Sequence, residues 1–220
     1  MTKAKKTLAP QQERSRESLR KLQKATAEVL GQHGVEGTTI PRIAQHAGLT
    51  PGAIYRRFHD KDALLEATIL GILERQEERI KGGLTPDKAA QIPLPLFAEQ
   101  VVGGMVLSYR VNAALLRALR TFALSRQNTG FYKKAAKLEA RAFAHAVELF
   151  MAHKKEIRHP DPSVAVSLGL MMVSSMLYDW VVMPTDTSAW KQFLPKDDQE
   201  LKQELTRAFL SYLGVEQKRG

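Results

Sequence analysis

The feature that most constrains the fold is a helix start signal, a glycine stop and a second start signal in quick succession. Thr39 can accept hydrogen bonds from the first free amides of a helix, and Pro41 in its first turn lacks the N–H that would otherwise stay unsatisfied. Gly48 adopts a left-handed conformation at little cost and ends that helix. A threonine followed by a proline then repeats the start signal. The pattern predicts two short helices, 39–47 and 51–58, joined by a tight turn.

A longer helix is predicted before this pair. Apolar residues recur at helical spacing over about 11–32, and Gly34 is expected to end the helix. A longer helix followed by two short helices across a glycine turn is the helix-turn-helix pattern. Its small core is expected to contain Ile43, Ala44, Leu49, Ile54 and Phe58.

The outward side of the second short helix carries small and cationic residues. Gly52 and Ala53 remove side-chain bulk at its start, so the helix end can approach another surface closely. Tyr55 has a hydroxyl suited to a phosphate, and Arg56 and Arg57 can contact phosphate or reach guanine. An α-helix fits the major groove of duplex DNA. These residues therefore predict a DNA-reading helix.

Several segments resemble the DNA-binding domain of TetR-type transcriptional regulators, over roughly residues 14–66. They are Thr38-Thr39-Ile40, Ile43-Ala44, the run from Ala47 to Tyr55 and the run from Phe58 to Leu65. The resemblance implies DNA contacts by Thr38 or Thr39 and by Thr50, Gly52, Ala53, Tyr55, Arg57 and Lys61. Pro41 departs from the polar or charged residue that many relatives have there, which leaves a base contact from the first short helix open.

Plainer interpretations of these residues stay open. Thr39 and Thr50 can serve only as helix caps, and Arg56 can be merely solvated.

Lys61 lies beside the N-terminal amides of the next helix, a combination that favours phosphate. The chain carries a net charge of +10, and its first 24 residues hold eight basic and two acidic residues. Within the expected flexible arm 1–10, Lys3, Lys5 and Lys6 are either a plain charged tail or a DNA-following segment.

The remainder of the chain also has helical patterns, so the predicted class is all-α. One helix is expected over 60–81, followed by a stretch broken by two glycines and three prolines. Further helical segments are expected at 96–110, 112–125, 130–155, 162–183 and 197–213. The predicted domains are the arm 1–10, a DNA-binding domain over 11–60 and a regulatory domain over 61–220.

The resemblance implies that this second domain holds a dimerisation surface and an internal ligand pocket. Apolar residues at helical spacing supply the dimerisation candidates, although packing within one chain is the alternative. These candidates are Val164, Leu168, Met171, Leu201, Leu205, Phe209 and Tyr212. Pocket candidates are aromatic and Met residues near isolated polar groups. They are Met105, Tyr109, Phe122, Phe143, Met172, Met176, Asp179 and Trp180. The alternative is that Asp179 pairs at the rim and the methionines are ordinary core.

Enzymatic chemistry is not indicated. The absence of Cys excludes a thiol nucleophile and Cys-ligated metals, the six histidines lack metal-ligand spacing, and no Gly-rich phosphate loop or nucleophile elbow occurs. No cofactor or metal is expected. The uncharged apolar stretch Ser163–Tyr178 is short for a membrane span and predicts a buried helix. A basic start without an apolar core does not suggest a signal peptide, so a cytoplasmic location is expected.

The sequence therefore predicts a homodimeric, ligand-responsive repressor that binds a palindromic operator and is released by a small molecule. A transcriptional activator, a dual regulator and a nucleoid-type DNA-binding protein without a ligand are the alternatives.

Overall fold

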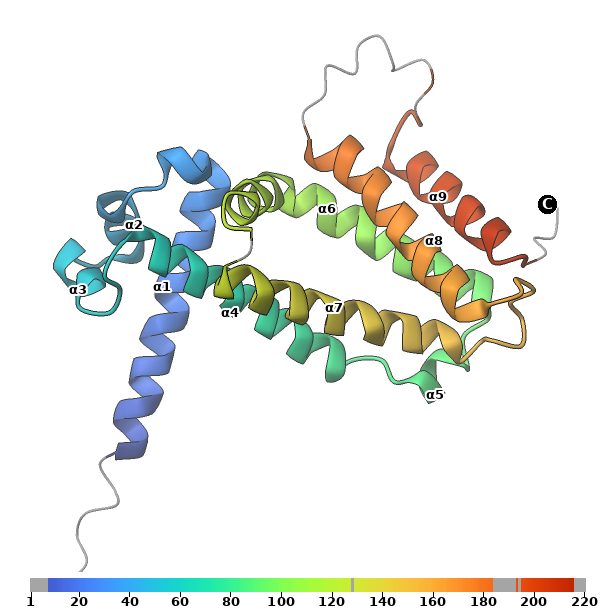
Figure 1. The fold of residues 1–220 in the computed structure, drawn as a ribbon, viewed down its shortest axis with the longest axis horizontal. Coiled ribbons are helices and arrows are strands. Elements are labelled where there is room, and N and C mark those ends of the chain that lie inside the picture. The colour runs from blue at the N-terminus through green and yellow to red at the C-terminus, as the bar shows by residue number, and fades with distance from the viewer. Residues whose placement is uncertain (1–7, 128, 184–192, 194, 216–220) are drawn as a thin grey trace, which may run out of the picture.

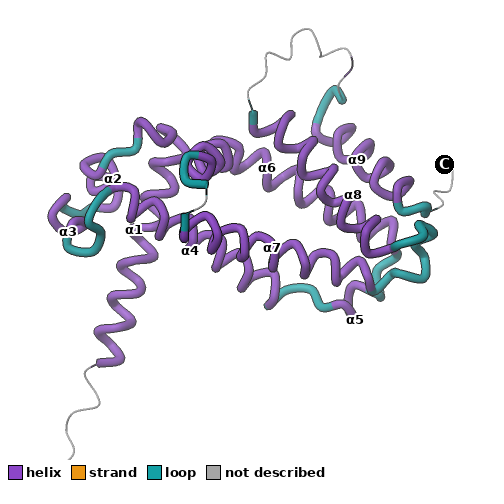
Figure 2. The backbone as a smooth tube through the Cα atoms, in the orientation of Figure 1, coloured by secondary structure: helices purple, strands orange, loops and turns teal. Residues whose placement is uncertain are grey.

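The structure is a computed structural model that describes residues 8–127, 129–183, 193 and 195–215. The residues Lys3, Lys5 and Lys6 of the predicted basic arm lie outside the described residues. The described part of the chain is helical and contains no strand, which confirms the all-α class (Figure 2). Its elements are α1 (Leu8–Gly37), α2 (Ile40–Ala47), α3 (Pro51–Tyr55), α4 (Lys61–Lys81), α5 (Pro86–Ala89), α6 (Leu94–Leu124), α7 (Gly130–Met151), α8 (Pro162–Leu177), a π-helix η1 (Tyr178–Val182) and α9 (Asp198–Tyr212).

The first three helices form the predicted helix-turn-helix at one end of the molecule (Figure 1). Gly34 leaves helical geometry with φ 66° and ψ −177°, so the predicted stop in α1 is a kink, after which the helix continues to Gly37. Thr39 is the N-cap of α2, and Gly48 ends α2 in the left-handed conformation with φ 65°. The second short helix, α3, ends at Tyr55 and is therefore shorter than the predicted helix 51–58.

A small core holds this unit together. Leu49 was expected in it but is 37% exposed, because it follows Gly48 in the turn and only its backbone amide points inward, donating to the carbonyl of Ala44 at 2.8 Å. The partly buried ring of Phe58 packs against the core as predicted. The fully buried members are Leu22, Val29, Ile40, Ile43, Ala44, Ile54 and Leu64.

A second core joins the helix-turn-helix to the rest of the protein. It draws on α1, α4, α6 and α7, and α4 therefore packs with both parts of the molecule. The predicted domain boundary between residues 60 and 61 coincides with the N-cap of α4, where Asp60 accepts a hydrogen bond from the amide of Ala63 at 2.8 Å. The buried residues of this second core are Leu30, Leu65, Ile69, Ala118, Phe122, Phe131 and Ala135.

The largest core lies among α5 to α9 and η1. Here the predicted break at Asn112 is wrong, since α6 runs uninterrupted from Leu94 to Leu124. The side-chain amide of Asn112 donates to the carbonyl of Ser108 one turn earlier, at 2.8 Å, and so satisfies itself inside the helix. The short helix α5 in the glycine and proline segment was not predicted.

One helical stretch in the described part of the chain, Pro162–Val182, is long and apolar enough to cross a membrane. Its most apolar window is 39% buried, which is the share expected of a helix with one face in a core. That inner face packs on α6, α7 and α9, as expected of a helix in a globular core rather than a membrane span. The opposite face of α8 is left exposed.

Candidate nucleic-acid interface and regulatory unit

The helix α3 begins with a cap that leaves its first turn open to the outside. The hydroxyl of Thr50 accepts a hydrogen bond from the amide of Ala53 at 3.2 Å. Gly52 is exposed, and a Cβ built on it meets no heavy atom within 4 Å. Packing within the chain therefore does not require glycine at this position. A helical glycine costs stability relative to alanine, and no contact within the described chain offsets that cost at Gly52.

The side chains predicted to meet DNA from α3 lie on the surface. Tyr55 is 55% exposed, and Arg56 and Arg57 are exposed directly after it. Figure 1 shows α3 at the far end of the molecule from α9, with no other element beyond it. Ala53 is half-buried and adds little bulk. The arrangement can place a narrow, cationic helix against a groove.

The two threonines before α2 differ in their surroundings. Thr38 is fully buried, and its hydroxyl donates to the carbonyl of Gly34 at 2.6 Å. It closes the kink of α1, so the expectation that Thr38 contacts DNA is corrected. Thr39 is exposed and caps α2 by accepting from the amide of Arg42 at 3.4 Å.

Lys61 is half-buried rather than free. Its ammonium group donates to the carbonyl of Val35 at 3.3 Å and so links the start of α4 to the end of α1. Arg42, an exposed cation on the first turn of α2, was not among the predicted DNA contacts, and Leu49, predicted in the core, lies exposed in the turn. Arg42 is an exposed cation beside Pro41, and that position alone is the signal that could have identified it.

The dimerisation candidates separate into two groups. The outer α8 face, defined as Val164, Leu168, Met171, Met172 and Met176, is exposed throughout. Leu201, Leu205 and Phe209 are instead buried in the largest core of the same subunit. A Cβ on Gly169 of α8 would lie 2.6 Å from the Phe209 ring, which shows how closely α8 and α9 pack within one chain. The prediction that these three α9 side chains face a partner is therefore corrected.

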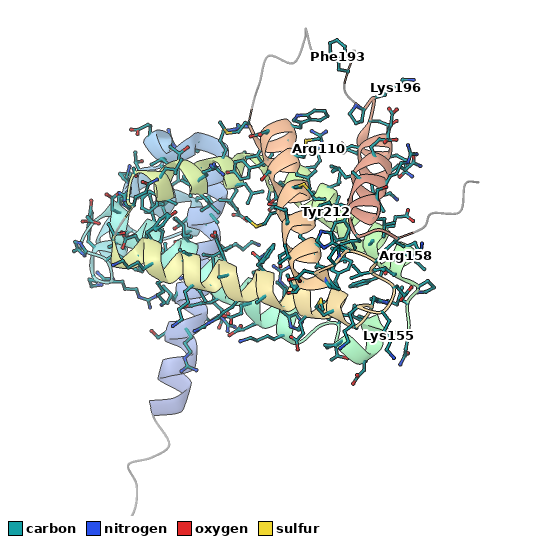
Figure 3. All side chains as sticks on the ribbon, turned by 45° about the vertical axis from the view of Figure 1, so that its right-hand side comes forward. Arg110, Lys155, Arg158, Phe193, Lys196 and Tyr212 are labelled. Carbon is teal, nitrogen blue, oxygen red and sulfur yellow. The ribbon has the colours of Figure 1, made fainter. Side chains whose placement is uncertain are left out.

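Tyr212 at the end of α9 is half-buried. Its ring lies 5.4 Å from the ring of His159, and Figure 3 shows Tyr212 near Arg158 on the adjoining loop. At the other end of α9, Arg110 on α6 pairs with Asp198 at 2.7 Å. These contacts fix α9 on its own subunit, whereas the outer α8 face has no partner within the described chain.

The structure brings together only part of the predicted pocket. Met105, Tyr109, Phe143 and Trp180 are partly buried against the largest core. Phe122 belongs to the second core, Met172 and Met176 lie on the outer α8 face, and Asp179 is exposed on η1. The hydroxyls of Tyr109 and Ser174 are 2.7 Å apart and join α6 to α8.

A polar cluster beside these residues was not predicted. The hydroxyl of Tyr178 on η1 donates to the carbonyl of Leu116 at 2.9 Å, and the guanidinium of Arg120 lies 4.5 Å from its ring centre. Burial raises the pKa of Tyr178, and the charge of Arg120 opposes that rise. Desolvation also raises the pKa of Glu139, although its side chain remains accessible to solvent. The sequence holds no signal for this cluster, because it depends on how α6, α7 and η1 cross.

Among the described residues, no group of three or more His, Asp and Glu side chains is placed to hold a metal ion. The features above define a helix-turn-helix protein in which a small reading unit is attached to a larger helical unit.

Known proteins share both parts. A family model described as bacterial regulatory proteins, tetR family, matches residues 22–68. The HTH-type transcriptional regulator BetI of Escherichia coli O45:K1 (strain S88) is 32% identical over 105 residues, which are 47% of this chain and 52% of BetI. The match thus spans about half the length of that relative.

Solved structures extend the likeness over most of the chain. A protein described as a TetR-family transcriptional regulator from Mesorhizobium loti superposes with a TM-score of 0.69 at 16% identity, covering 91% of this chain and 97% of that one. FadR from Bacillus subtilis, in complex with stearoyl-CoA, has a TM-score of 0.58 at 18% identity and covers 88% and 98%. Identities this low show a shared fold. Residues 22–68 thus match the tetR family of bacterial regulatory proteins, and the chain as a whole shares the fold of proteins described as TetR-family regulators.

Proposed function

We propose that this protein is a dimeric transcriptional regulator that binds duplex DNA through α3. The observation that carries the proposal is the exposed first turn of α3, where Gly52 faces open space and is followed by Tyr55, Arg56 and Arg57 on the surface. Phosphate contacts from such cations fix the register of a helix in the major groove, and base edges then supply sequence preference.

Two copies are needed for a defined operator. Dimeric helix-turn-helix proteins bind half-sites about 34–36 Å apart, one helical turn, so operator palindromy follows the protein's twofold axis. The outer α8 face supplies the contact between copies, since five large apolar side chains exposed on one helix gain from burial against a partner. The interface therefore rests on α8, with Tyr212 of α9 at its edge.

A small molecule bound in the helical unit acts as the effector and releases the repressor from its operator in the bacterial cytoplasm. The support is the group Met105, Tyr109, Phe143 and Trp180, which places apolar and hydroxyl groups together in that unit. A structural neighbour, FadR of Bacillus subtilis, is in complex with stearoyl-CoA. To move a 1:99 equilibrium to 99:1, the effector must bind the DNA-incompetent state better by about 5.5 kcal/mol.

The decisive experiment is selection of bound fragments from genomic DNA with the purified full chain. The expected result is a small set of near-palindromic sites, bound by a dimer with an affinity that falls as salt rises. A protein that is monomeric at micromolar concentration, or that binds no duplex in a salt-dependent manner, overturns the proposal.

The role of Lys61 can be tested on the selected operator. If its ammonium neutralises one phosphate, Lys61→Ala lowers the slope of log affinity against log salt by about 0.9. An unchanged slope assigns Lys61 only to its hydrogen bond with the carbonyl of Val35.

A further inference from the structure

A cleft with a volume of about 560 Å³ lies between α1 and α4, and its lining includes no residue of α3 or of the outer α8 face. In Figure 1 the N-terminal half of α1 and the C-terminal half of α4 diverge from a crossing point, and α3 lies on the other side of α1. The cleft occupies the angle between the two helices. Its lining consists of Arg20 from α1 and of Ile72, Arg75, Glu78 and Arg79 from α4.

The crossing point holds one of these arginines in position. Gln23 is only 7% exposed, and its side-chain amide donates to the carbonyl of Ala67 at 2.8 Å. The oxygen of the same amide accepts from the guanidinium of Arg75 at 3.0 Å. A Cβ on Gly71 would lie 2.7 Å from this amide, so only glycine admits Gln23 at this depth. A buried amide, hydrogen-bonded through both its nitrogen and its oxygen, therefore orients Arg75.

The charges of the cleft are not balanced by the chain itself. Arg75 and Arg79 are four residues apart on one helical face, an arrangement in which like charges repel. Arg20 adds a third guanidinium from the opposite wall, whereas Glu78 is the single carboxylate in the lining. Across the described ranges, Arg20 and Arg79 take part in no ion pair, and the hydrogen bond of Arg75 goes to a neutral amide.

The shape of the cleft favours a small anion over a nucleic acid. Its volume lies in the range of small-molecule sites, about 300–1,000 Å³. Its walls come from two helices, and the cleft is open to solvent on the side of Arg20, Glu78 and Arg79, which are exposed. Guanidinium groups bind phosphate and carboxylate oxygens in pairs, and Ile72 supplies an apolar contact for the remainder of a ligand.

We propose that the cleft between α1 and α4 is a binding site for a small multivalent anion, either a phosphate compound or a polycarboxylate. The guanidinium groups of Arg20, Arg75 and Arg79 hold the anion. Because Arg20 belongs to the helix-turn-helix unit and α4 also packs on α7, the bound anion links the reading unit to the helical unit. The site is separate from the effector group beside Tyr109.

The test is calorimetric titration of the full chain with pyrophosphate and, separately, with citrate, in the absence of DNA. Saturable binding of at least one probe at one site per subunit is expected. Arg79→Gln and Arg20→Gln should each raise the dissociation constant about tenfold, because each removes charge-assisted hydrogen bonds. Glu78→Gln removes the repelling carboxylate and should tighten binding. The matched control is Lys133→Gln, which removes one charge on the exposed side of α7.

The two probes also distinguish the sources of the anion. Binding of pyrophosphate alone assigns the site to phosphate compounds, and binding of citrate alone assigns it to polycarboxylates. Absence of saturable binding by both probes, or an equal loss in Lys133→Gln, overturns the proposal. A variant Arg79→Gln that weakens only duplex binding also overturns it, since the cleft would then be a DNA contact. The calorimetric results are independent of the proposed function, because no DNA is present in the titration.

Discussion

The outer surfaces of α3 and α8 are equally exposed but chemically opposite. Tyr55 on α3 and Met171 on α8 each have 55% of their surface accessible. Tyr55 has two arginines directly after it in the chain, whereas Met171 lies among the aliphatic and sulfur-containing side chains of the outer α8 face. The first surface gains by exchanging counterions for phosphates, and the second gains by leaving water. The two surfaces are equally exposed, and the chemistry of the side chains around Tyr55 and Met171 indicates that they bind different partners.

The comparison also explains why the two surfaces lie on different parts of the fold. The reading helix projects from the small core and remains accessible as a narrow edge (Figure 1). The helix α8 is anchored over its whole length by the largest core, so that its outer face is presented as a broad, rigid strip. If two copies pair through α8 as proposed, the packing of α8 on the core sets the spacing between their α3 helices, and a palindromic operator requires a defined spacing.

The largest expected effect comes from placing a charge on the apolar surface. Met171→Asp should raise the dimer dissociation constant about a hundredfold, since an unpaired charge buried at an interface costs several kcal/mol. The subunit itself should fold normally because Met171 is exposed. Sedimentation equilibrium measures the constant, and Ala136→Asp on the exposed side of α7 is the control. A variant that stays as dimeric as this control would show that α8 is not the interface.

A smaller loss is expected from truncation on the cationic surface. Tyr55→Ala should weaken operator binding about tenfold, which corresponds to about 1.4 kcal/mol, while leaving the dimer intact. Tyr55→Phe separates the hydroxyl from the ring, because it retains the apolar contact. Fluorescence anisotropy with the selected operator is the measurement. If Tyr55→Ala binds as the unmodified protein does, the docking face lies elsewhere.

The reading unit could be predicted closely because its signals are local. Thr39, Gly48 and Thr50 specify caps and a left-handed turn through their own side chains and backbones. Two residues within the same unit were nevertheless misplaced. Thr38 turns inward to the carbonyl of Gly34 at the kink of α1, and Leu49 turns outward because it follows the left-handed Gly48 in the turn.

The helical unit was predicted less well because its signals are ambiguous. An apolar stripe such as Leu201, Leu205 and Phe209 has the same spacing whether it faces a partner or the subunit's own core. The outer α8 face carries the same periodicity and differs only in what lies opposite to it. The cluster around Tyr178 joins segments about sixty residues apart in the chain, and no sequence pattern encodes such a crossing.

Two glycines near α3 are expected to respond in opposite ways to replacement by alanine. Gly52→Ala should raise the free energy of unfolding by about 0.5 kcal/mol, since the new methyl group meets nothing and alanine favours helix, yet it should weaken operator binding. Gly48→Ala should lower the free energy of unfolding by about 1–2 kcal/mol, because its φ of 65° strains any side chain. Urea unfolding and operator titration measure the pair. If Gly52→Ala binds the operator with unchanged affinity, α3 does not need glycine at this position to approach DNA closely.

The smallest expected effect concerns the α4–α7 layer that connects the two surfaces. The ion pair with Lys81, whose Nζ lies 2.8 Å from Oε1 of Glu77, lowers the pKa of Glu77 against the opposing effect of burial, and the charge of Arg141 lowers it further. Desolvation raises the pKa of Glu139 on α7. Both carboxyl groups have an ordinary pKa of 4.5. The ionised form of Glu77 therefore stabilises the folded protein, whereas the ionised form of Glu139 destabilises it.

These signs predict opposite effects on unfolding. A carboxyl whose folded pKa is lowered stabilises the protein above its unfolded pKa and loses that contribution as the pH falls through the folded value. Glu77→Gln should therefore reduce stability at pH 7 and have progressively less effect below about pH 4.5. Glu139→Gln should increase stability at pH 7, because it removes a charge that the fold disfavours, and this gain should also vanish in acid. Thermal unfolding from pH 3 to pH 7 measures both differences. If the two variants change stability in the same direction at neutral pH, desolvation does not distinguish the two carboxyl groups. The packing of α4 on α7 then does not depend on the ion pair between Glu77 and Lys81.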